Sequence, residues 1–246
     1  LKGTEPVKTL DLSRKGLKAA SAVVIAKLIE FNAVLTSLDV GLNSLDEEAA
    51  LGIVRVARQH DRMTFLGLAR CGIGPTGAKE IAEYISVTSV LTECSLLKNK
   101  LDVESATMLA KIGTEKRIML SGMKQEHTEA NFIGEGLQPA DAILIASDLP
   151  FMAVLNKLVL TDNEIKDEGA SALGEALKVN KSLKELVLIR CKIGPDGGKA
   201  LAAALSEGTA VLNKIVLSHN KIKDEGAIAL GKALKINKTL KELKLT

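Results

Sequence analysis

Hydrophobic residues recur along this chain in a fixed frame. The segments that begin at Leu35, Leu155, Leu183 and Leu212 all read L-x-x-[LI]-x-[LV]-x-x-[NC]-x-[LI]. Apolar and polar residues alternate in the first part of this frame, which predicts a short β-strand. The residues that follow have apolar side chains at helical spacing, for example Ala170, Leu173 and Leu177. We therefore predict one strand and one helix for each copy of the frame.

The frame covers nearly the whole chain. It also fits the segments that begin at Val7, Met63, Leu91 and His127, and in part the one at Leu240. The steps between successive starts are 28, 28, 28, 36, 28, 28, 29 and 28 residues. An array of strand-plus-helix units at a nearly constant period is typical of a repeat protein.

The single long step of 36 residues marks an insertion, which we place near residues 119–126. Because the strand register resumes directly after it, we expect the insertion to project from the helix side or from the adjoining loop. Three roles stay open for the insertion: a hinge, a docking element or a neutral insertion. As a docking element, Met119, Leu120 and Met123 would form a small adaptable contact surface. His127, which follows, is expected to occupy a core position and to have a structural role.

The pattern resembles the leucine-rich repeat of the ribonuclease-inhibitor-like class over residues 7–246. Members of that class combine this strand frame with a helix that opens G-[AG]-x-x-[LI]-[AG]. The resemblance implies an α/β fold, namely a leucine-rich-repeat solenoid, or horseshoe, with a parallel concave sheet and helices on the convex side. It implies a single domain over residues 1–246. In this class the Asn or Cys at the ninth position, such as Asn163 or Cys191, bridges backbone groups of the turn and of the adjacent unit.

The glycines of RCGIGPTGAK resemble a dinucleotide-binding turn, because Gly72, Gly74 and Gly77 are spaced as G-x-G-x-x-G. The same element recurs as IGPDGGK at Ile193, where Gly194 matches Gly74. We therefore interpret the glycines as part of the repeat, where the helix must approach the sheet closely. Gly74 and Pro75 suit a tight turn with Pro at the start of a helix.

Composition argues against several classes of function. The three cysteines, at positions 71, 94 and 191, are too far apart for a zinc site or a disulfide framework. No His lies at a useful spacing from a nucleophile and an acid, so we predict no catalytic residue, no metal, no cofactor and no enzymatic activity. A net charge of +3 and few aromatic residues disfavour nucleic acid. No segment resembles a signal peptide or a membrane span, so we expect a cytoplasmic protein.

The candidate site lies on the concave sheet of the later units. The third positions of successive strands carry opposite charges, which can pair laterally: Lys157, Glu185 and Lys214. The fifth positions form an apolar stripe, and a neighbouring side chain widens it: Val159, Val187, Val216 and Ile189. An exposed apolar stripe often marks an interface, although Val and Ile favour strands in any context. Both explanations stay open at this point.

Three functions fit these features. The first is a non-enzymatic scaffold that binds a protein partner through the concave sheet and its flanking loops. The second is a regulator of a small GTPase, because Ran GTPase-activating proteins resemble this repeat class. The third is the ligand-sensing repeat portion of a larger NOD-like receptor. In each case the partial unit at Leu240 leaves a bare strand, which a neighbouring chain or further repeats are expected to cover.

Overall fold

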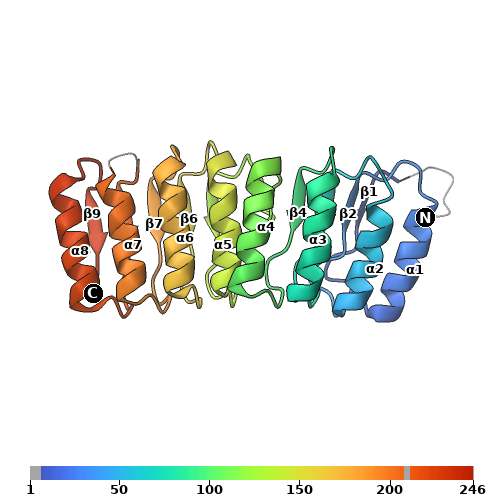
Figure 1. The fold of residues 1–246 in the computed structure, drawn as a ribbon, viewed down its shortest axis with the longest axis horizontal. Coiled ribbons are helices and arrows are strands. Elements are labelled where there is room, and N and C mark those ends of the chain that lie inside the picture. The colour runs from blue at the N-terminus through green and yellow to red at the C-terminus, as the bar shows by residue number, and fades with distance from the viewer. Residues whose placement is uncertain (1–6, 208–210, 246) are drawn as a thin grey trace. The chain divides into compact units, whose positions relative to one another are not determined.

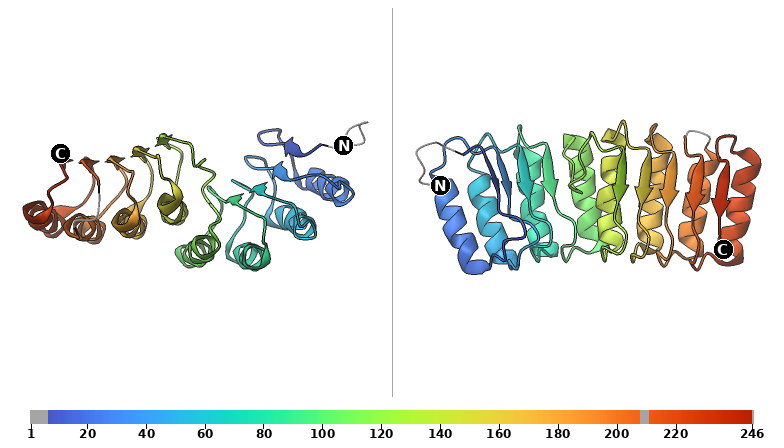
Figure 2. Two further views of the ribbon diagram at one scale, coloured as in Figure 1. Left: turned by 90° about the horizontal axis from the view of Figure 1, so that it is seen from above. Right: turned by 180° about the vertical axis from the view of Figure 1, so that it is seen from behind.

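The computed structural model describes residues 7–207 and 211–245, and the chain divides into two compact units, 1–122 and 123–246. Within each unit the strands form one layer and the helices form another (Figures 1 and 2). The first unit contains β1 (Thr9–Asp11), α1 (Ala19–Glu30), β2 (Ser37–Asp39), α2 (Glu47–Ala57), β3 (Phe65–Gly67), α3 (Pro75–Val87), β4 (Glu93–Ser95) and α4 (Val103–Lys116). The second contains β5 (Glu129–Asn131), α5 (Pro139–Asp148), the short 3₁₀ helix η1 (Leu149–Phe151), β6 (Lys157–Val159), α6 (Lys166–Val179), β7 (Glu185–Val187), α7 (Pro195–Ser206), β8 (Lys214–Val216), α8 (Lys223–Ile236) and β9 (Glu242–Lys244).

Neighbouring strands pair in parallel and in the register that the sequence frame predicts. In the second unit, Lys157 of β6 lies opposite Glu185 of β7, and Glu185 lies opposite Lys214 of β8. The strands β1 to β4 form one sheet in chain order, and β5 to β9 form another. The predicted series of strand-plus-helix repeats is therefore confirmed. Because each unit is compact by itself, a single domain over residues 1–246 stays a prediction.

Aliphatic side chains fill the space between the sheet and the helices of each unit. Leu158, Leu186 and Ile215 occupy the same column on adjacent strands and are fully buried. Each such side chain contributes about 1.5–3 kcal/mol by leaving water. Cys94 is fully buried in the corresponding column of the first unit, as predicted, and packs there as a small hydrophobic residue.

In four of the repeats an asparagine side chain joins the repeat to the one before it, namely Asn43, Asn99, Asn163 and Asn220. Asn220 Oδ1 accepts hydrogen bonds from the backbone N–H groups of Cys191 and Ile193, both at 3.0 Å. Its Nδ2 donates to the carbonyl oxygens of Leu188 and Leu217. The ninth-position bridge is thus confirmed, and it satisfies four backbone groups that would otherwise have no partner in the turn.

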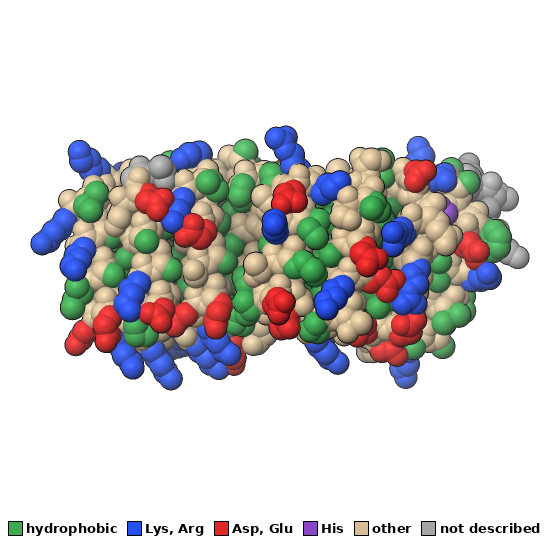
Figure 3. Space-filling view, viewed as in Figure 1, with side chains coloured by type: hydrophobic (Ala, Val, Ile, Leu, Met, Phe, Trp, Pro, Cys, Tyr) green, Lys and Arg blue, Asp and Glu red, His purple; other side chains and the backbone are tan. Residues whose placement is uncertain are grey.

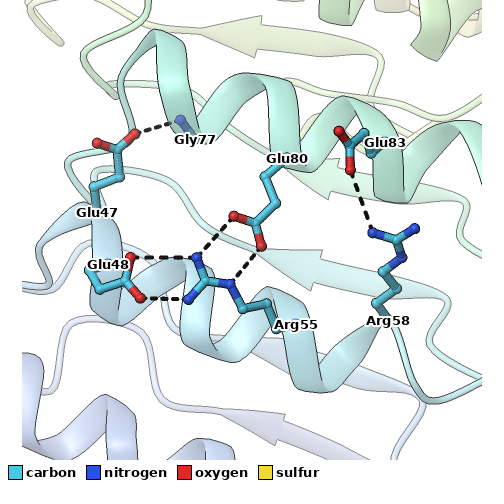
Figure 4. A network of polar contacts seen from close by, with 7 residues as sticks. All are labelled: Glu47, Glu48, Arg55, Arg58, Gly77, Glu80 and Glu83. Carbon is cyan, nitrogen blue, oxygen red and sulfur yellow. Dashed lines mark hydrogen bonds and ion pairs between the residues drawn. The ribbon is translucent and has the colours of Figure 1, made fainter.

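A second connection between repeats explains the glycines of the GPxG turns. Glu47, at the start of α2, accepts hydrogen bonds through Oε1 from the backbone N–H groups of Gly74 (3.0 Å) and Gly77 (2.7 Å) at the start of α3. Figure 4 shows the carboxylate lying against this helix end. A Cβ atom on Gly77 would lie 2.5 Å from that Oε1 atom. The glycine is therefore required by a carboxylate of the preceding repeat, which caps the helix from outside.

The same helices are joined further along by arginines. The Arg55 guanidinium contacts Glu48 of its own helix α2, through Nη1 at 2.5 Å, and Glu80 of α3, through Nε at 2.8 Å (Figure 4). Arg58 pairs with Glu83 at 3.7 Å. These groups are largely exposed, and exposed ion pairs contribute at most about 1 kcal/mol. The hydrogen bonds of Glu80 and Glu48 raise the pKa of Arg55, so the guanidinium keeps its charge at any ordinary pH.

The insertion near residues 119–126 does not project, so that prediction is wrong. Met119 forms a parallel bridge with Glu93, and its carbonyl accepts from the backbone N–H of Cys94 at 2.8 Å. The carbonyl oxygen of Leu120 accepts a hydrogen bond from the backbone N–H of Leu96 at 2.9 Å. Met119, Leu120 and Met123 are all buried, so they form no exposed contact surface. The segment follows β4 because an open strand edge leaves backbone groups without partners.

The prediction for His127 is also wrong in part. The side chain is exposed rather than in the core. The Nδ1 atom of the ring accepts a hydrogen bond from the backbone N–H of Lys124 at 3.2 Å. The backbone N–H of His127 donates to the carbonyl oxygen of Lys124 at 2.9 Å. His127 therefore closes the turn that leads into β5. Its role is structural, as predicted, but it lies in an exposed turn instead of the core.

Candidate functional site

The strand face of the second unit carries an open groove of about 690 Å³, which we call the sheet groove. Its lining contains all seven side chains that the sequence singled out: Lys157, Val159, Glu185, Val187, Ile189, Lys214 and Val216. They meet because β6, β7 and β8 are in register, which places equivalent positions side by side. That a partner binds there stays a prediction.

A continuous ladder of charges crosses the sheet groove. Glu185 lies between two lysines, with Oε2 at 3.9 Å from Lys157 Nζ and Oε1 at 3.4 Å from Lys214 Nζ. Lys214 also lies 3.6 Å from Glu242, which in turn pairs with Lys244 at 3.0 Å. The predicted lateral pairing is confirmed. The carboxylate of Glu185 raises the pKa of Lys214, and the ammonium of Lys244 lowers the pKa of Glu242, so these two groups stay charged near neutral pH.

The apolar stripe is less exposed than the sequence suggested. Val187 and Val216 are only 9% and 6% exposed, because each has neighbours on both adjacent strands. Val159 and Ile189 are half-buried. Ile133, just after β5, is 51% exposed and is the most accessible apolar residue of the lining. The apolar contact that the sheet groove offers a ligand is therefore greater at Ile133, Val159 and Ile189 than at the central valines.

The loops after the strands add polar side chains that the sequence analysis did not single out. Arg190 lies at the edge of the groove and pairs with Asp162 at 3.6 Å. His219 occupies the equivalent place one strand further on and is exposed. Both have positive φ, which directs the chain sharply out of the strand. The signal that could have found them is their shared eighth position in the frame. Four basic and two acidic side chains line the groove, and two further carboxylates, those of Asp162 and Glu242, pair with the basic ones, so positive and negative groups are balanced.

The cysteines take no part in the sheet groove. All three are free and buried, and burial raises the pKa of each thiol to about 12. Cys191 Sγ donates to the carbonyl oxygen of Leu160 at 3.1 Å, so it serves the turn in place of Asn. A thiol in this state is a poor nucleophile. Within the two described ranges, His, Cys, Asp and Glu residues form no group of three that could hold a metal ion.

Comparison with known proteins identifies the repeat. A family model described as leucine-rich repeat matches residues 63–82, 152–174, 179–202 and 211–231. The ribonuclease inhibitor of Sus scrofa is 27% identical over 229 residues, which cover 91% of this chain and 48% of that protein. The chain is a leucine-rich repeat protein of the ribonuclease-inhibitor-like class.

Two further relatives share the similarity. The NACHT, LRR and PYD domains-containing protein 13 of Homo sapiens is 26% identical, over 93% of this chain and 21% of that protein. The Ran GTPase-activating protein of Drosophila melanogaster is 35% identical over 124 residues, which cover 46% of this chain and 20% of that protein. The chain thus spans about half the length of these relatives, or less. In the described part of this leucine-rich repeat protein, every helix is too short or too polar to cross a membrane.

Proposed function

We propose that this leucine-rich repeat protein is a non-enzymatic scaffold that binds a protein partner through the sheet groove and the loops at its edge. The observation that carries the proposal is the groove itself, which combines an accessible apolar strip with a ladder of fixed charges. Such a surface suits a partner that inserts an apolar side chain between charged contacts. The name of the ribonuclease inhibitor relatives supports a protein partner. The three free, buried cysteines suit the cytoplasmic location that we propose.

The charges of the sheet groove favour a partner that carries charges of both signs. Lys157, Lys214, Lys244 and Arg190 each pair with a carboxylate, which belongs to Glu185, Glu242 or Asp162. Complementary charges fix the register of a complex and select among partners more than they add to affinity.

The test compares two single substitutions that add the same charge on opposite sides of the second unit. Ile189→Glu changes the sheet groove, whereas Val179→Glu changes the end of α6, where Val179 is exposed on the helix side. Each variant is used for affinity capture from native extract, and captured proteins are identified by mass spectrometry and titrated with purified chain. We expect Ile189→Glu to lower the affinity at least about tenfold and Val179→Glu to leave it unchanged. The reverse result would place the interface on the helices.

A second candidate is a regulator of a small GTPase, favoured by the 35% identity with the Ran GTPase-activating protein. Such a regulator acts on a bound GTPase, so it needs no complete catalytic site of its own. The test is single-turnover GTP hydrolysis by a panel of purified small GTPases, Ran included, with and without this chain. Rates that stay at the intrinsic value for every GTPase would remove this candidate.

A third candidate is the sensor portion of a larger receptor, favoured by the match to the human NACHT-containing relative over nearly all of this chain. The chain covers only 21% of that relative, so the nucleotide-binding module of such a receptor would lie elsewhere. The messenger RNA decides this point, because a receptor requires a NACHT-like module in the same open reading frame.

A further inference from the structure

Two stretches of the second unit have nearly the same sequence in different surroundings. Residues 166–189 form α6 and β7, residues 223–246 include α8 and β9, and the two stretches differ at only six of 24 positions. The helix α7 packs against α6, whereas within the described residues no helix follows α8. The repeat that covers α6 and β7 therefore shows what the end of α8 and β9 is shaped to contact.

Apolar side chains buried in the first stretch are exposed in the second. Leu177 of α6 is 2% exposed, and its counterpart Leu234 of α8 is 42% exposed. Leu188, just after β7, is fully buried, and its counterpart Leu245 is 41% exposed. A row of apolar groups that an almost identical sequence buries elsewhere marks an unfilled contact surface. Figure 3 is drawn in the view of Figure 1, and at its left end, where Figure 1 labels α8, apolar side chains lie among charged ones.

Glycines show the same difference. A Cβ atom on Gly174 would lie 3.0 Å from the backbone carbonyl oxygen of Ala200 in α7, so α7 can approach only because this residue is glycine. Gly231 is its counterpart in α8, and a Cβ atom there would meet nothing within 4 Å. An exposed glycine inside a helix costs about 1 kcal/mol relative to alanine, so Gly231 weakens α8 without any contact that requires it.

A carboxylate completes the surface. Asp167 Oδ1 accepts hydrogen bonds from the backbone N–H groups of Gly194 (2.5 Å) and Gly197 (3.0 Å), which open α7. A Cβ atom on Gly197 would lie 2.6 Å from the same Oδ1 atom, so this cap requires glycine in the incoming helix. Asp224 is the counterpart of Asp167 and is exposed. Glu47 and Gly77 repeat the arrangement in the first unit, so it occurs twice.

We propose that the end face of the second unit binds a further leucine-rich repeat whose helix opens with Gly-Pro-Xaa-Gly. This face, which we call the α8–β9 face, consists of Asp224, Ala227, Gly231, Leu234, Leu243 and Leu245. The occupant presents two glycine N–H groups to Asp224, packs its helix backbone on Gly231 and covers Leu234. The first repeat of a second copy lacks these features, because Lys18 and Ser21 stand where the two glycines are needed. The inference is independent of the sheet groove.

The test joins this occupant to the full chain. The sequence of residues 190–220 is appended after Thr246, so that the new turn and helix follow β9 as α7 follows β7. Hydrogen exchange of the α8 amides and the urea midpoint are measured with and without the addition. We expect exchange in α8 to slow at least about tenfold and the midpoint to rise. Unchanged exchange in α8 would overturn the proposal.

Two substitutions separate specific docking from a general effect of added chain. In the 246-residue chain nothing lies against Gly231, so we expect Gly231→Ala to raise the urea midpoint. In the extended chain the backbone of the new helix lies against this residue, so the same substitution should lower the midpoint. Asp224→Asn leaves the first midpoint almost unchanged and lowers the second. The appended repeat with its copies of Gly194 and Gly197 both replaced by alanine serves as the matched control, and we expect it to protect α8 less. The same sign for Gly231→Ala in both chains would exclude this geometry.

Discussion

The carboxylate of Glu47 caps a helix that belongs to the next repeat, with Oε1 2.7 Å from the backbone nitrogen of Gly77. Helix caps are normally supplied by a residue just before the helix, as Asp46 does for α2. Here the donor and acceptor are 30 residues apart in sequence. The bond therefore stabilises the packing of α2 against α3 as well as the start of α3.

We expect Gly77→Ala to lower the free energy of unfolding by about 1 kcal/mol, although alanine is the better helix former. The new Cβ atom would displace Glu47 and break the hydrogen bonds to Gly74 and Gly77. Gly52→Ala in α2 is the matched control, because a Cβ atom there meets nothing within 4 Å, and it should stabilise the protein slightly. Urea denaturation measures both. In the Glu47→Ala background the cost of Gly77→Ala should largely disappear, and a cost that persists would contradict the capping role.

Leu120→Ala should lower the free energy of unfolding by about 2–4 kcal/mol, because the side chain is fully buried beside β4. A projecting insertion would tolerate the change. The control is Glu126→Ala, at an exposed position of the same insertion, for which we expect less than about 0.5 kcal/mol. Equal midpoints for the two variants in urea would show that Leu120 is not packed in the core.

Stability should fall steeply in alkali. The pKa of each buried thiol is raised from 9.0 to about 12, so the unfolded chain releases protons that the folded chain retains. The thiols therefore favour folding fully below pH 9, and this contribution is lost as the pH rises from 9 towards 12. In that range each thiol makes the free energy of unfolding fall by about 1.4 kcal/mol per pH unit. Urea midpoints of the parent and of Cys191→Ala, measured from pH 8 to 11, test this, and parallel curves would refute it.

Lys214→Glu should lower the urea midpoint of the second unit at low salt, because it leaves carboxylates on three adjacent strands at the same position. The loss should shrink in 1 M NaCl, since these side chains are partly exposed and salt screens them. Lys241→Glu, at an exposed site just before the neighbouring strand β9, is the control. A loss that does not depend on salt would indicate a packing effect instead of charge repulsion.

The sequence predicts the strand registers and the core well, because both follow from a period that nearly every repeat preserves. Leu158 and Leu186 lie opposite each other simply because the frame repeats after 28 residues. Lateral charge pairing at Glu185 follows from the same register. In these cases a local pattern and the fold impose the same constraint, so the pattern is sufficient.

The features that the sequence did not predict depend on contacts between residues far apart in the chain, which a local pattern does not reveal. Val187 reads as exposed from strand alternation, but valines on both adjacent strands cover it. Leu120 lies in a break of the frame, where the backbone hydrogen-bonding needs of β4 decide the conformation. Gly77 is conspicuous in the sequence, yet the residue that requires it, Glu47, belongs to the previous repeat. The available signal was an acidic residue at the thirteenth position of a repeat when the next repeat contains a GPxG turn. It occurs at Glu47 and again at Asp167.

The segment that lies along β4 also bears on how the protein is made. Residues 118–121 come just after α4 and before β5, so the ribosome delivers them ahead of every strand of the second unit. The nascent chain can thus shield the last edge of its first sheet while most of the remaining repeats are still untranslated. Neighbouring chains on one polysome then find no bare β4 edge to pair with, which removes a common route to aggregation during synthesis.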